Sequence, residues 1–106
     1  MPEKNNVRIL ITVEKIEGTC PIYDEGDEIE IENFYIVSSD SENICVHALS
    51  AMTTFLTAFL NGVSAVDLGL GTKDDTAYIQ CPDPGPPCTE GGTVLFKLKR
   101  LESGEE

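Results

Sequence analysis

The amino-acid sequence predicts an α+β fold in which one main amphipathic helix packs on one face of a mostly antiparallel four-stranded sheet. Apolar and polar residues alternate in four segments, and a longer segment between them has helical periodicity. The segments follow one another in the order strand, strand, helix, strand, strand (β-β-α-β-β). A helix laid across an antiparallel sheet is the simplest arrangement that buries both apolar faces.

Two of the predicted strands precede the helix. Residues 7–13 alternate in polarity, with Leu10 as the exception, which is the period of a half-buried strand. Residues 18–26 (GTCPIYDEG) are rich in turn formers and predict a loop. In residues 28–32 (EIEIE) isoleucine and glutamate alternate strictly, which predicts the second strand. Asn33 breaks this phase before residues 34–37, so a bulge or a turn is expected between two strand pieces.

The helix is predicted over about residues 44–61. Apolar residues recur there at steps of three and four, which places them on one broad face. Ser39 and Glu42 have the spacing of a capping box and are expected to start the helix, and Gly62 is expected to end it. The phenylalanines of the apolar face are predicted to be core residues: Phe55 and Phe59.

Two further strands follow the helix. Residues 76–81 (TAYIQC) alternate and predict the third strand, whereas the four prolines and three glycines of residues 82–92 predict a loop. Residues 93–101 form the fourth predicted strand, with Lys97 and Lys99 on the side opposite its apolar residues. These lysines are expected to share the outer face of the sheet with the glutamates of 28–32, where cross-strand pairs offset repulsion.

Length and composition predict a single domain over residues 1–106, with 1–6 and 102–106 as mobile tails. The chain has 19 acidic and 7 basic side chains, for a net charge of -12. This balance argues against nucleic acid as a partner, because phosphate binding needs clustered lysine and arginine. It also argues against an anionic membrane surface, and the sequence holds no apolar run long enough to span a bilayer. A cytoplasmic location is therefore expected.

The four cysteines are the main candidates for chemistry. Cys20 and Cys81 each precede a proline at the border of a strand and a loop, and Cys45 lies near the helix start. Such proline-fixed turns occur around zinc and iron thiolate sites. We therefore predict a zinc or iron site, or a thiol-redox pair, from Cys20, Cys45 and Cys81, with Cys88 or His47 as the fourth ligand. Because no CxxC is present, buried inert thiols are the alternative interpretation.

A second candidate site is the acidic segment 24–32, which holds six carboxylates. Asp24, Asp27 and Glu28 are predicted to bind Ca²⁺ or Mg²⁺ weakly, since both ions prefer oxygen ligands. The alternative is a solvated acidic face that attracts cations loosely. His47 is the single histidine of the sequence, and it cannot form a dyad with Cys45 because residues two apart on a helix project to different sides.

Several short motifs resemble those of a family of small uncharacterised prokaryotic proteins of about one hundred residues. They are GTCP at 18–21, GD at 26–27, ICVHAL at 44–49, CPDPG at 81–85 and VLFKL at 94–98. The resemblance implies a compact prokaryotic cytosolic domain and directs attention to Cys20, Cys45 and Cys81. Cys88 falls outside the family pattern, and no reaction is implied by the resemblance.

Two classes of function follow from these patterns. The first is a small cytosolic metal-thiolate or thiol-redox binding protein that uses clustered cysteines. The second is a non-catalytic protein-interaction module that uses the acidic face or the outer sheet face, with structural cysteines. The sequence has no nucleotide-binding, serine-hydrolase or zinc-protease motif, so an enzyme is the third interpretation.

Overall fold

The structure is a computed structural model that describes residues 7–20, 22–33, 35–81, 88 and 92–101. The side chains of Asp40 and His47 lie outside this described part. The predicted mobile tails at 1–6 and 102–106, and most of the predicted loop at 82–92, fall outside it as well.

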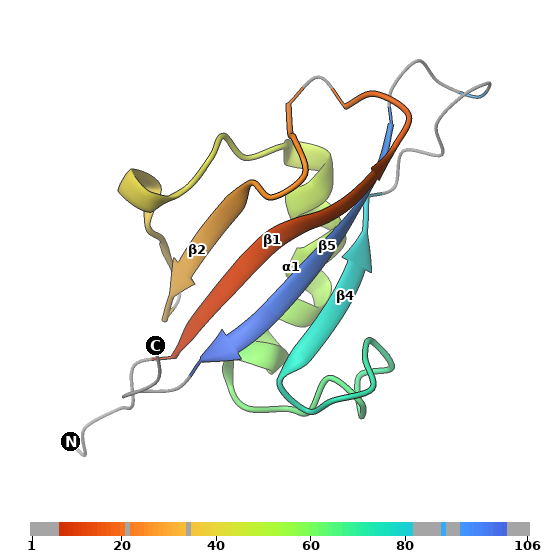
Figure 1. Cartoon of the computed structure of the whole chain (residues 1–106). Coiled ribbons are helices and arrows are strands. Elements are labelled where there is room, and N and C mark those ends of the chain that lie inside the picture. Colours follow the sequence, from red (N-terminus) through yellow and green to blue (C-terminus); the bar gives the residue numbers. More distant parts are fainter. Residues whose placement is uncertain (1–6, 21, 34, 82–87, 89–91, 102–106) are drawn as a thin grey trace.

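The described residues form an antiparallel sheet with one α-helix on one of its faces, which confirms the predicted α+β class (Figure 1). The strand order in the sheet is β3-β2-β1-β5-β4. In chain order the elements are β1 (Arg8–Glu17), β2 (Glu28–Glu32), β3 (Tyr35–Ile36), the 3-10 turn η1 (Ser38–Asp40), α1 (Val46–Leu60), β4 (Thr76–Gln80) and β5 (Thr93–Leu101). Among the described residues, no helix is both long and apolar enough to cross a bilayer.

The prediction of four strands in the order β-β-α-β-β was wrong, because the sheet has five strands. Asn33 has a φ of 56°, and this left-handed conformation reverses the chain, so that Ile36 returns to pair with Ile31. The turn is tied to β1, because the Asn33 amide donates to the Val7 carbonyl at 2.7 Å. The interruption expected at Asn33 is therefore a turn between two paired strands.

The helix begins within two residues of its predicted start, but the predicted capping box does not cap it. Helix α1 begins at Val46 with Cys45 as its N-cap, and the capping-box residues lie outside it. The segment before the helix is held to β2 instead: the Ser41 hydroxyl donates to the Val37 carbonyl and accepts from the Glu30 amide. A segment that is bonded to a strand in this way cannot enter the first turn of a helix. The predicted end agrees, since Gly62 follows the C-cap with a φ of 95°.

Strand β1 is longer than its alternating pattern indicated. It continues to Glu17, and its register with β5 shifts between Val13 and Lys15. This β-bulge inserts one residue, Glu14, without a partner and moves the later residues by one step in the alternation. The sequence therefore shows the period of a strand as far as Val13 and loses it afterwards.

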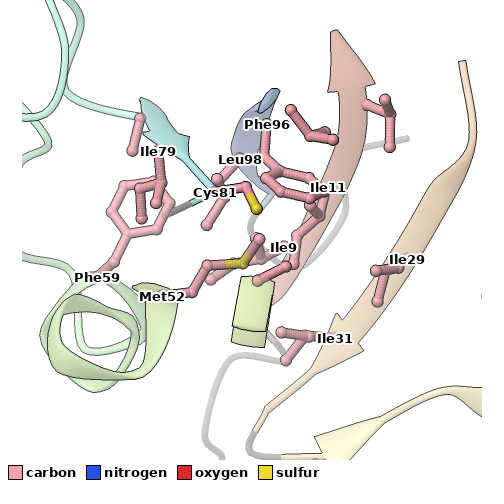
Figure 2. Packing of buried hydrophobic residues seen from close by; sticks show 14 of the residues in the cluster. Ile9, Ile11, Ile29, Ile31, Met52, Phe59, Ile79, Cys81, Phe96 and Leu98 are labelled. Atoms are coloured by element: carbon pink, nitrogen blue, oxygen red, sulfur yellow. The ribbon is translucent and has the colours of Figure 1, made fainter. Parts of the chain in front are cut away.

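The core lies between α1 and the covered face of the sheet (Figure 2). Met52 and Phe59 reach from the helix toward Ile9 and Ile11 of β1 and toward the inward residues of β4 and β5. Phe59 is buried as predicted, while Phe55 is only half-buried against the cluster. Strand β5 supplies three deeply buried inward residues: Val94, Phe96 and Leu98.

One charged side chain lies on the covered face of the sheet. Arg100 is 7% exposed, and its guanidinium donates to the carbonyls of Phe59 (2.8 Å), Val63 (2.9 Å) and Asp74 (3.2 Å). It also stacks on the Phe59 ring at 4.6 Å from the centroid. A cation at the last carbonyls of a helix is favoured by their partial negative charge. Arg100 therefore joins the end of α1 and the following segment to β5.

Candidate functional site

Three of the four cysteines border the core. Cys20 lies in the loop after β1, Cys45 is the N-cap of α1, and Cys81 follows β4 with its amide bonded to the Val94 carbonyl at 2.8 Å. Cys81 is buried, and Figure 2 draws its thiol inside the core. Cys20 and Cys45 are half-buried against the same cluster, whereas Cys88 is exposed, and all four are free thiols.

Tyr23 connects this group. Its ring packs edge-on against Phe96 with 5.6 Å between centroids, and its hydroxyl accepts a hydrogen bond of 2.8 Å from the Cys45 amide. Burial raises the pKa of Tyr23 above its ordinary value, the hydrogen bond from the Cys45 amide lowers it, and negative charge at Cys45, Cys20 and Asp27 raises it further. Tyr23 is buried, and its hydroxyl ties the N-cap of α1 to the core.

Among the residues that the structure describes, no three His, Cys, Asp or Glu side chains form a group that could hold a metal ion. The side chain of His47, one of the two predicted fourth ligands, lies outside that part of the chain. The zinc or iron site therefore stays a prediction. The thiol-redox version stays one too, because no disulfide joins the cysteines.

The acidic loop uses its carboxylates to hold the backbone. An Asp27 carboxylate oxygen accepts from the Asp24 amide at 2.8 Å, and a Glu25 oxygen accepts from the Ile16 amide at 3.0 Å. These bonds fix the turn that joins β1 to β2. Glu28 lies on the uncovered face of the sheet, opposite Thr12. The weak cation site at Asp24, Asp27 and Glu28 also stays a prediction, and two of the loop carboxylates have a structural role.

The uncovered face of the sheet separates negative from positive charge. Its β2 column consists of Glu28, Glu30 and Glu32, and its β5 column includes Lys97 and Lys99, as the sequence predicted. Strand β1 lies between the two columns, so the predicted direct pairs of glutamate and lysine do not form in this sheet. Glu30 pairs with Arg8 of β1 instead, at 3.1 Å.

The positive side of this face is hollowed. A hollow of about 320 Å³ lies over β1, β5 and β4, and the lysines that line it are Lys73, Lys97 and Lys99. These are three of the seven basic residues of the chain. The hydroxyl-bearing side chains of Thr12, Thr76 and Tyr78 also line it. The hollow therefore presents ammonium and hydroxyl donors, which suits a ligand with carboxylate or phosphate oxygens.

Only one of these lysines is neutralised by a described carboxylate. Lys99 forms an ion pair with Asp75 at 2.9 Å, and its hydrogen bond, followed by that of Thr76, lowers the pKa of Asp75 below its ordinary value. Lys73 and Lys97 have no ion pair within the described residues. Two uncompensated positive charges thus remain in the hollow of a strongly acidic protein.

No family model, no curated protein and no solved structure matches the chain. The resemblance to small prokaryotic proteins therefore stays a prediction.

The sequence indicated part of the lysine-lined hollow. The alternation of Lys97 and Lys99 placed both on the outer face, but Lys73 lies in a segment with no clear period. An isolated antiparallel bridge between Lys73 and Thr76 places Lys73 beside the start of β4. The sequence feature that could have indicated the hollow is the position of three of the few basic residues, at 73 and at 97–99.

Proposed function

We propose that this protein is a non-catalytic interaction module whose uncovered sheet face binds a carboxylate-rich surface of a partner protein. The observation that carries the proposal is the hollow lined by Lys73, Lys97 and Lys99. In a chain of net charge -12, such a gathering of positive charge gives the hollow a preference for carboxylates that the glutamate column of β2 does not have.

The spacing of the lysines suits an extended acidic segment. Lys97 and Lys99 lie two residues apart on one strand, so their side chains leave the sheet about 7 Å apart on the same side. Carboxylates on alternate residues of another extended segment repeat at the same interval. Each lysine can then meet one carboxylate without any change in the backbone of β5.

A protein partner fits this face better than a nucleic acid. Nucleic-acid binding depends on the neutralisation of many phosphates, and this hollow supplies three lysines within a strongly negative chain. The apolar and aromatic side chains of Leu10 and Tyr78 beside the lysines add contact area of the kind found in protein interfaces. The cytoplasmic location expected from the sequence belongs to the same proposal.

The test is binding of a fluorescent peptide in which glutamate and threonine alternate, followed by anisotropy. The same peptide with glutamine in place of glutamate is the matched ligand control. We expect the glutamate peptide to bind and the double variant K97Q/K99Q to bind it at least about tenfold more weakly. Lys15→Gln is the matched protein control, because Lys15 lies on the same face outside the hollow and pairs with Glu17. Equal binding of the two peptides would contradict the proposal.

A second candidate is the thiol chemistry predicted from the sequence, as a metal-thiolate or thiol-redox binding protein. What favours it is that Cys20 and Cys45 pack against the same hydrophobic cluster that contains Cys81. Elemental analysis of protein purified without chelator tests the metal version, with Cys45→Ser as the variant that should lose zinc or iron. A metal-free protein whose thiols react no faster than those of the unfolded chain would contradict this candidate.

A further inference from the structure

We infer that the partner of the uncovered sheet face is a second copy of this chain, packed face to face about a twofold axis parallel to β1. The inference rests on the proposed function and names the source of the carboxylates as the β2 column of the other copy. It follows from the order and register of the strands, because these make the face complementary to itself.

The charges are arranged in matched rows. Leu10 of β1 is opposite Glu30 on one side and Lys99 on the other, and Thr12 is opposite Glu28 and Lys97 in the same way. Each of these two rows therefore carries a glutamate, a small or apolar residue and a lysine in that order, whereas the row at the end of β1 carries Glu32, Arg8 and Leu101. Strands β2 and β5 flank β1 at equal strand spacings of about 4.8 Å.

A twofold axis parallel to β1 places the β2 column of one copy over the β5 column of the other. Each row keeps its position along the strand direction. Glu30 of each copy then faces Lys99 of the other, and Glu28 faces Lys97. Leu10 meets its own equivalent at the centre of the interface, as does Thr12. Such an isologous contact, in which one patch meets itself, is the usual form of a homodimer. The strands of two aligned sheets cross at about 30°. Facing residues in the central rows stay nearly opposite one another, because these rows lie close to the crossing point.

This axis brings together two charges that have no ion pair among the described residues of one copy. Glu28 and Lys97 take part in no ion pair within the described residues, whereas Glu30 pairs with Arg8 and Lys99 pairs with Asp75. The dimer therefore forms two new ion pairs of Glu28 with Lys97. The existing pairs of Glu30 with Arg8 and of Lys99 with Asp75 lie beside them. The net charge of -12 on each copy opposes association, so the dimer is expected to be weak at low ionic strength, where that repulsion is least screened.

A charge-swap experiment tests the inference by sedimentation velocity at about 0.15 M salt, where the Debye length is about 8 Å. The wild type should form dimers as its concentration rises. Lys97→Glu places a second carboxylate against Glu28 of the other copy, and Glu28→Lys places two ammonium groups together, so each variant alone should dimerise at least about tenfold more weakly. An equal mixture of the two variants restores a pair of opposite charges and should recover the dimer. The double variant E28K/K97E, which keeps the net charge, should dimerise as the wild type does.

The control is Glu42→Lys, which makes the same change of charge as Glu28→Lys at an exposed residue outside the sheet. It should leave the dimer intact. Circular dichroism and thermal unfolding check that each variant is folded, and Glu28→Gln and Lys97→Gln serve in place of any variant that is not.

Three results would overturn the inference: a monomeric wild type at millimolar concentration, dimers that survive each single charge swap, or a mixture that stays monomeric. A monomeric wild type that still binds the glutamate peptide through Lys97 and Lys99 would remove the second copy as partner and leave the proposed function standing. A monomer that binds no peptide would remove both.

Discussion

The two faces of the sheet use the same strands for opposite purposes. On β5, Phe96 and Arg100 point to the helix and are buried, whereas their neighbours Leu95 and Lys99 lie on the uncovered face and are partly exposed. The covered face gains stability from apolar contact and from one arginine that donates three hydrogen bonds. The uncovered face separates its charges and leaves some of them without partners. Alternate residues of one strand therefore contribute to the core and to the charged surface, so that substitutions at adjacent positions can test the two faces separately.

The largest difference in the free energy of unfolding is expected between the variants Phe96→Ala and Leu95→Ala. Phe96 is 0% exposed and packs against Tyr23, so its truncation should lower the free energy of unfolding by about 3–5 kcal/mol. Leu95 is half-buried on the other face, and its truncation should cost no more than about 1 kcal/mol. Urea unfolding at low protein concentration measures both. Equal losses would mean that the uncovered face is packed as tightly as the core.

The next contrast compares Arg100→Met with Lys99→Met. Loss of the Arg100 guanidinium removes its hydrogen bonds to the carbonyls of Phe59, Val63 and Asp74, which should cost about 1.5–3 kcal/mol. Lys99 loses only an exposed ion pair, which is worth about 0–1 kcal/mol. Thermal unfolding of the two variants gives the comparison. A Lys99 variant as unstable as the Arg100 variant would contradict the distinction between the faces.

Tyr23→Phe removes a single hydrogen bond under the covered face. The Cys45 amide loses its acceptor, and we expect a loss of about 0.5–1.5 kcal/mol. Because the pKa of Tyr23 is raised in the folded state, the unfolded chain releases its phenolic proton first as the pH rises. The stabilisation is complete below the ordinary pKa of 10.0 and is lost as the pH rises through the higher folded pKa. Unfolding between about pH 8 and 11 should show a steeper decline for wild type than for the variant.

The smallest effect is expected from Asp75→Asn at the edge of the uncovered face. Hydrogen bonds from Lys99 and then from Thr76 lower the pKa of Asp75 in the folded state. The resulting stabilisation is present above the ordinary pKa of 3.8 and is lost as the pH falls through the lower folded pKa. The variant should therefore lose less stability than wild type on acidification. About 1 M NaCl should reduce the difference, because the pair is exposed; a difference that salt does not change would point to a buried role.

The sequence was informative where local pattern determines structure. Strand β5 has the predicted limits, and the helix lies within two residues of its predicted ends, because each has an uninterrupted period. The missed features depend on contacts between distant residues. The bulge after Val13 interrupts the alternation of polarity, so the second half of β1 could not be recognised from the sequence. Strand β3 forms because the chain reverses at Asn33, whose amide is bonded to the Val7 carbonyl. Ser39 and Glu42 have capping-box spacing, but the bonds of their segment to β2 override it.

The candidate site was predictable only in part for the same reason. The side of the sheet that carries Lys97 and Lys99 follows from alternation, and so does the side that carries the glutamates of β2. The strand that separates them, and the contribution of Lys73, follow from topology. The cysteines were found by their turns, but whether they meet depends on the path of the whole chain.

The pairing of β1 with β5 also has a consequence for how the chain folds. These two central strands come from opposite ends of the described chain, and Arg8 pairs with Leu101. A sheet whose middle is closed by contacts so distant in sequence has a high contact order, and such proteins fold slowly. During synthesis, the first hairpin leaves the ribosome with one edge of β1 unpaired until β5 follows, and an unpaired edge can pair with other chains. Strand β5 thus determines when the nascent chain stops being prone to aggregation.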